Sequence, residues 1–138
     1  MKNHTLLAAF AFAAVALTAV SLTACSKSAT VEGEGTGKLT LVKPGNVTLH
    51  RGGMAKADIK IKRQDLLGDV TIRFSNLPSG VDVVETDSRI VGDAGSYTLR
   101  ASETADLVEN YAVEVTATAG PGSIAVSQPM NVSVKLKE

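Results

Sequence analysis

Few side chains in this 138-residue chain have the type and spacing needed for covalent or acid–base chemistry. Cysteine occurs once, at Cys25, so no disulfide can form within the chain. Histidine occurs only at His4 and His50, and the sequence contains no nucleophile-elbow motif. A Ser/His/Asp triad or a blue-copper site needs further groups in defined positions. The sequence therefore predicts no catalytic residues, no cofactor and a protein that is not an enzyme.

Acidic residues gather in the second half of the chain and raise the alternative of a calcium site. They are offset there only by Arg89 and Arg100. The group comprises Asp82, Glu85, Asp87, Asp93, Glu103, Asp106 and Glu109. Calcium takes roughly six to eight oxygen ligands, and the spacing matches no EF-hand or repeat-type loop. The simpler interpretation is that these residues lie in solvated loops. The alternative is that the loops bind calcium or a small ligand.

The N-terminal residues give the single cysteine a context. Lys2 supplies a positive charge, an apolar run extends from Leu6 to Leu22, and small residues follow, which is the organisation of an export signal. The run is near the lower length limit for spanning a bilayer, so an uncleaved transmembrane anchor is the alternative. The stretch Leu22-Thr23-Ala24-Cys25 closely resembles the lipobox of bacterial lipoproteins.

This resemblance implies cleavage between Ala24 and Cys25, which makes residues 1–24 a lipoprotein signal peptide. It also implies a diacylglyceryl group on the Cys25 thiol and often an acyl group on its new amino group. A deprotonated thiol suits this chemistry because it is a good nucleophile, and two or three acyl chains make release from the membrane slow. Residue 26 is Ser rather than Asp. By analogy with sorting in enteric bacteria, this favours the outer membrane over the inner membrane.

The charge balance argues against nucleic acid as a partner. The chain carries 14 basic and 14 acidic residues. Removal of residues 1–24 takes away Lys2 alone, which leaves 13 basic against 14 acidic residues. Nucleic-acid binding requires a basic face, and a near-neutral domain does not provide one. The predicted partners are a membrane, reached through the lipid, and an envelope protein or a glycan.

Residues 25–37 are predicted to be the lipidated cysteine and a flexible tether. The sequence from Ser26 to Gly37 is polar, contains three glycines and shows no hydrophobic period. A dozen such residues would span about 20 Å. The alternative is an edge strand, because Ala29 to Val31 includes apolar side chains.

Residues 38–138 are predicted to form one all-β domain. Apolar and polar residues alternate along Ala55–Lys62, Val70–Ser75, Tyr97–Ser102 and Tyr111–Thr118, as expected for strands with one buried face. Turn signals separate these stretches at roughly 8–12-residue spacing, which predicts a β-sandwich of about seven strands. Pro129 cannot donate to a ladder, so the last strand is expected to be an edge strand or to be bulged there. Only Glu103–Asn110 has room for a helical turn.

Three stretches resemble bacterial immunoglobulin-like and fibronectin type III-like domains. Asn76–Val81 is similar to their L-P-x-G-V turn, Tyr111–Ala117 to their strand F, and Ser127–Val134 to their final strand. The disulfide and the buried Trp of antibody domains are absent from the sequence. Tyr111 lies two residues before the position of the second antibody cysteine, so the resemblance implies a structural tyrosine corner.

These features together predict an envelope lipoprotein that displays a non-enzymatic immunoglobulin-like module for contacts with protein or glycan. Sandwich modules often place binding residues on end loops. The turns at Gly52-Gly53, Gly92–Gly95 and Gly120–Gly122 are therefore candidate contact loops.

Overall fold

A computed structural model describes residues 27–32, 37–120 and 124–138. These residues contain ten strands, and none of them is helical. The strands are β1 (Ser28–Glu32), β2 (Lys38–Val42), β3 (Val47–His50), β4 (Met54–Gln64), β5 (Val70–Ser75), β6 (Val81–Val83), β7 (Arg89–Ile90), β8 (Ala94–Ala101), β9 (Val108–Ala119) and β10 (Ile124–Lys135).

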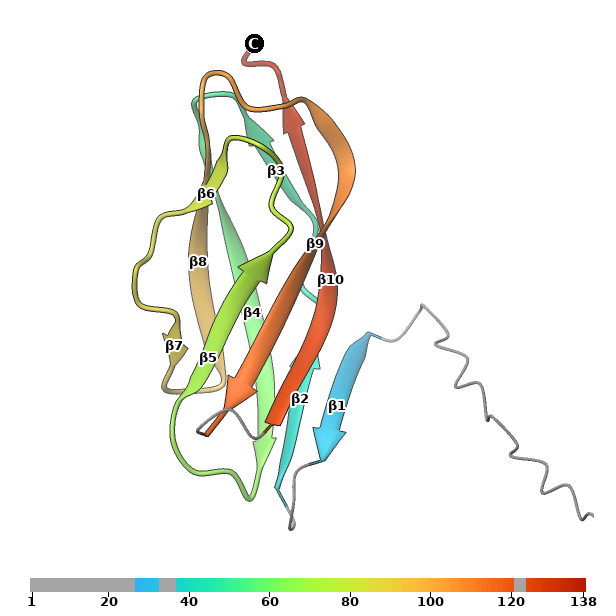
Figure 1. The fold of residues 1–138 in the computed structure, drawn as a ribbon, viewed down its shortest axis with the longest axis vertical. Helices are drawn as coiled ribbons and strands as arrows, with labels where there is room; N and C mark the ends of the chain where they lie inside the picture. The colour runs from blue at the N-terminus through green and yellow to red at the C-terminus, as the bar shows by residue number, and fades with distance from the viewer. Residues whose placement is uncertain (1–26, 33–36, 121–123) are drawn as a thin grey trace, which may run out of the picture.

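The strands form two five-stranded sheets, with β5, β9 and β10 in front of β4 and β8 in Figure 1. The first sheet has the order β1-β2-β4-β8-β6, and the second has the order β3-β10-β9-β5-β7. The run β2-β4-β8-β6 reproduces the A-B-E-D sheet of an immunoglobulin-like sandwich, and β5-β9-β10 reproduces its C-F-G sheet. The predicted fold class, an all-β immunoglobulin-like β-sandwich, is confirmed.

The expected count of about seven strands is too low. Four of the ten described strands, β1, β3, β6 and β7, lie at sheet edges and contain only two to five residues. Alternation of apolar and polar residues is hard to recognise over so few positions. The helical turn considered for Glu103–Asn110 is absent, because this segment makes a turn and then enters β9 at Val108.

The core lies between the sheets and is built from the alternating apolar positions. In β4 the buried side chains are Ala57, Ile59 and Ile61, while Lys56, Lys60 and Lys62 point to solvent. The largest side chains with almost no exposed area are Leu39, Leu41, Leu49, Ile59, Ile72, Ile90, Leu99 and Met130. Aliphatic packing therefore holds the sandwich together without a disulfide.

Pro129 lies where β10 has a ladder partner on one side only. It pairs with Glu114 of β9, whereas the parallel pairing of β10 with β3 begins at Val132. The expectation that the last strand is an edge strand is wrong for β10 as a whole, because β10 lies between β3 and β9. The missing N–H of Pro129 is tolerated because the pairing with β3 does not reach this residue. A register shift follows between Val132 and Val134.

The prediction of a flexible tether over residues 25–37 is wrong for Ser28–Glu32, which form strand β1. This strand pairs antiparallel with β2 along its whole length. The hydroxyls of Thr30 and Thr40 are hydrogen-bonded at 2.6 Å, and Glu32 forms an ion pair with Lys38 at 2.7 Å. Ala29 and Val31 pack against the core. The folded domain thus begins at Ser28 rather than at residue 38, as in the edge-strand alternative.

Candidate functional site

The predicted cleavage and lipidation residues, Ala24 and Cys25, lie outside the described residues. The described chain starts at Lys27, whose carbonyl oxygen accepts a hydrogen bond of 2.8 Å from the backbone N–H of Lys43. Over residues 27–32, 37–120 and 124–138, no helix has the length and apolar character to cross a membrane. The first described strand, β1, begins at Ser28, three residues after the predicted anchor.

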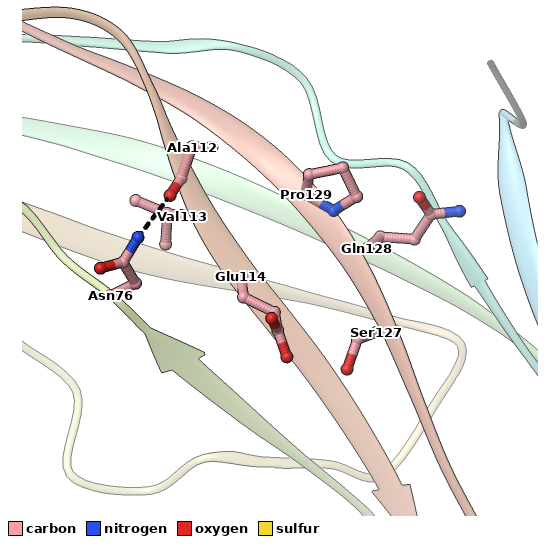
Figure 2. Close-up of a pocket in the computed structure, with 7 residues that line it drawn as sticks. All are labelled: Asn76, Ala112, Val113, Glu114, Ser127, Gln128 and Pro129. Carbon is pink, nitrogen blue, oxygen red and sulfur yellow. Dashed lines mark hydrogen bonds between the residues drawn. The ribbon is translucent and has the colours of Figure 1, made fainter. Parts of the chain in front are cut away.

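A groove of about 290 Å³ lies on the outer face of the second sheet, where β9 and β10 pass the end of β5 (Figure 2). It is lined by Asn76, Ala112, Val113, Glu114, Ser127, Gln128 and Pro129. Figure 2 shows the polar ends of Glu114 and Ser127 on the same side of the groove, whereas Gln128 points away from them. The amide nitrogen of Gln128 donates instead to the carbonyl oxygen of Leu41 in the first sheet, at 3.5 Å.

Asn76 forms one rim of this groove and is held there by two hydrogen bonds. Its amide nitrogen donates to the carbonyl oxygen of Ala112 at 3.0 Å, and its side-chain oxygen accepts from the hydroxyl of Tyr111 at 3.2 Å. The φ angle of Asn76 is 59°, a left-handed value that Asn tolerates better than most residues. The sequence predicts a turn that begins at Asn76 but carries no signal of its place in a groove.

Tyr111 makes a structural contact near the start of β9, but its partner is not the one expected in a tyrosine corner. That motif bonds the hydroxyl to a backbone atom a few residues upstream. Here the hydroxyl bonds the side chain of Asn76, which follows β5. Tyr111 therefore ties β9 to the β5–β6 turn.

The outer face of the second sheet is rich in small hydroxyl side chains and poor in charge. Five hydroxyl residues lie on β5, β9 and β10 here: Thr71, Ser75, Thr116, Thr118 and Ser127. The hydroxyls of Thr116 and Ser127 are hydrogen-bonded to each other at 2.8 Å. Arg73 and Glu114 are the charged side chains on these strands next to the groove. Such an array of hydroxyl groups can both donate and accept hydrogen bonds.

The acidic residues considered as a calcium site do not come together. Asp82 faces Arg100 at 3.7 Å, Asp87 faces Arg89 at 3.1 Å, and the Glu85 carboxylate accepts the backbone N–H of Thr98 at 2.6 Å. The hydrogen bond from Thr98 is the largest cause of the lowered pKa of Glu85. Within the described ranges no three His, Cys, Asp or Glu residues gather in a way that could hold a metal ion. These carboxylates therefore act in ion pairs and turns.

The candidate contact loops lie at opposite ends of the sandwich (Figure 1). The Gly52-Gly53 turn joins β3 to β4 at the end where the chain terminates, and Gly92–Gly95 leads from β7 into β8 at the other end. Of the third loop only Gly120 is described. At the end that carries Gly92–Gly95, the guanidinium of Arg63 donates to the carbonyl oxygens of Gly68 and Gly92, each at 2.6 Å. Arg63 therefore links this loop to the β4–β5 connection.

Comparison with solved structures finds similar immunoglobulin-like domains at low sequence identity. A chimeric titin Z1Z2 is 18% identical, with 72% of this chain and 95% of that chain covered and a TM-score of 0.40. The tandem Ig repeats of Dlar are 16% identical, with coverage of 70% and 47% and a TM-score of 0.44. Domains 4 and 5 of the S-layer protein SbsC are 15% identical, with coverage of 85% and 81% and a TM-score of 0.42.

No protein-family model matches the chain, and no curated protein matches it. The strand order of the two sheets is what assigns the fold class, an immunoglobulin-like β-sandwich. A fold of this kind hosts many functions, so a function has to be argued from the surface.

Proposed function

We propose that this chain is a lipid-anchored envelope protein whose immunoglobulin-like domain is a non-enzymatic module for contacts with an envelope protein or a glycan. The observation that carries the proposal is the lipobox-like stretch ending at Cys25, followed after two residues by a folded domain. Ser26 favours the outer membrane as the destination.

The anchor is supported by the chemistry that remains for Cys25. It is the only cysteine, so it has no disulfide partner in the chain. It follows an apolar run and the small residue Ala24, as signal cleavage requires. Lipidation therefore gives this thiol a use that matches its surroundings.

The contact surface is supported by the groove and the hydroxyl-rich face around it. Glu114 and Ser127 are exposed beside the groove, and neither Glu114 nor Arg73 has an ion-pair partner among the described residues. Asn76 is fixed by its two hydrogen bonds, so this rim is ordered before a partner arrives. A preordered polar surface loses less entropy on binding than a flexible one.

The anchor is tested by feeding cells an alkyne fatty acid and detecting label on the full chain. The expected result is label on the wild type and on Ser26→Ala, with none on Cys25→Ser. A labelled Cys25→Ser chain, or an unlabelled wild type, contradicts lipidation at this residue. The Ser26→Asp variant tests the destination, since it is expected to move the protein from the outer to the inner membrane fraction.

The contact face is tested with a photo-crosslinking amino acid placed in the full chain in living cells. Position Ser127 lies on the outer face of β10, and position Ser96 on the outer face of β8 is the matched control. A discrete protein or glycan adduct is expected at position 127 and not at position 96. Adducts at neither position, or at position 96 alone, would contradict the assignment of this face.

A further inference from the structure

The start of β1 limits how far the domain can lie from its lipid anchor. Three residue steps separate Cys25 from Ser28, and an extended chain spans at most about 3.5 Å per residue. The first paired residue of the sandwich is therefore within about 10 Å of the modified cysteine. A domain held this closely has one of its surfaces next to the headgroups.

Exposed lysines lie at this attachment point and on the outer face of the first sheet. We call Lys27, Lys43, Lys56, Lys60 and Lys62 the lysine face, and all five residues are exposed. The backbones of Lys27 and Lys43 are hydrogen-bonded at 2.8 Å. Lys43 and Lys60 line the same surface hollow, of about 340 Å³, and Asp58 lines it with them.

The charges of the lysine face are largely uncompensated within the protein. None of its five lysines forms an ion pair with a described residue. Its acidic neighbours are Asp58, on the same strand, and Glu85, whose pKa Lys56 helps to lower. The other basic residues of this sheet face are already paired, Lys38 with Glu32 and Arg100 with Asp82. The lysine face thus keeps an excess of positive charge.

We propose that the lysine face rests on the anionic headgroups of the membrane that holds Cys25. This inference depends on the proposed lipid anchor, which fixes the edge of the first sheet beside the bilayer. Basic segments next to an anchor are attracted to anionic lipid, and the attraction extends over about one Debye length. The outer face of β5, β9 and β10, with the groove beside Glu114, then points away from the membrane and is accessible to partners.

The test is amine acetylation of the mature protein, purified from cell membranes and placed in vesicles, read by mass spectrometry at each lysine. One set of vesicles contains phosphatidylcholine alone, and the other contains about one-third phosphatidylglycerol. Lys56, Lys60 and Lys62 are expected to react about fivefold more slowly on the anionic vesicles, and high salt is expected to restore their reactivity. Lys135, on β10 of the other sheet, is the internal control and is expected to react equally on both.

The lysine face is then altered by Lys60→Gln with Lys62→Gln, and the matched control is Lys135→Gln with Lys137→Gln. In the Lys60→Gln, Lys62→Gln variant, Lys56 is expected to react equally fast on both kinds of vesicle. In the control variant, Lys56 is expected to react more slowly on the anionic vesicles, as in the wild type. Equal reactivity of Lys56, Lys60 and Lys62 on both vesicle types overturns the proposed orientation. If the intact mass of the same sample shows lipid on Cys25, the anchor still holds in that case; if it shows none, both proposals fail.

Discussion

The turn at Gly80 offers a sharp test of how the β5–β6 connection is packed. Gly80 has a φ angle of 81°, and its carbonyl oxygen accepts the backbone N–H of Ser102 at 2.8 Å. A Cβ atom at this position would lie 2.7 Å from the Cα atom of Ala105, which is fully buried. The substitution Gly80→Ala therefore strains the turn and also forces the β8–β9 connection to move at the buried residue Ala105.

The magnitude follows from these two costs. A left-handed φ costs an L-residue about 1–2 kcal/mol, and displacing well-packed atoms costs about 1–3 kcal/mol. We expect Gly80→Ala to lower the free energy of unfolding by about 3 kcal/mol. Gly68 is the matched control, because its φ is 95° but a Cβ atom added there would meet no other atom within 4 Å. Gly68→Ala is expected to cost only about 1–2 kcal/mol.

Urea unfolding followed by far-ultraviolet circular dichroism measures both changes. Each Gly→Ala change also reduces the conformational entropy of the unfolded chain, which stabilises the folded protein. This contribution is the same in both variants, so it cancels when their free energies of unfolding are compared. Equal losses of stability in the two variants would refute the close packing of Gly80 against Ala105.

Three further predictions concern single side chains. Glu85→Gln should lower the melting temperature at pH 7. The pKa of Glu85 is lowered from 4.5 in the folded protein, so the carboxylate stabilises the fold above pH 4.5. The difference in melting temperature between wild type and variant should disappear as the pH falls through the folded pKa. A difference that persists in acid would contradict the role of its bond to Thr98. Leu99→Ala, at a fully buried position, should lower the free energy of unfolding by about 3 kcal/mol, measured in urea. Leu67→Ala, at a position 96% exposed, should lower it by less than about 0.5 kcal/mol. Similar losses in the two variants would argue against the assigned core. Tyr111→Phe removes one exposed hydrogen bond and should cost about 1 kcal/mol or less by thermal unfolding, and complete loss of folding would show that this hydroxyl does more than the single bond described.

The sandwich could be predicted because its long strands carry a local pattern. In β4, β8 and β9 every second side chain faces the core, so the alternation is present in the sequence itself. Strand β1 was harder to recognise, because its five residues include only two apolar side chains and glycines follow. Its stability comes from pairing with β2 and from contact with the core, and neither is visible locally.

The groove could not be predicted for a related reason. Its rim residue Asn76 and its wall residues Glu114 and Ser127 come from three separate places in the chain. They meet only because β9 pairs with both β5 and β10. The lysines of β4 were visible in the sequence, but their relation to Cys25 depends on the early start of the domain at Ser28.

The most direct test of the proposed lipid anchor is the intact mass of the mature protein isolated from cells. The account predicts a chain that begins at Cys25 and carries the added mass of a diacylglyceryl group, with or without a further acyl chain. Fragmentation should place all of the added mass on Cys25. A chain that still contains Lys2, or one that begins at Cys25 without added lipid, would contradict the account.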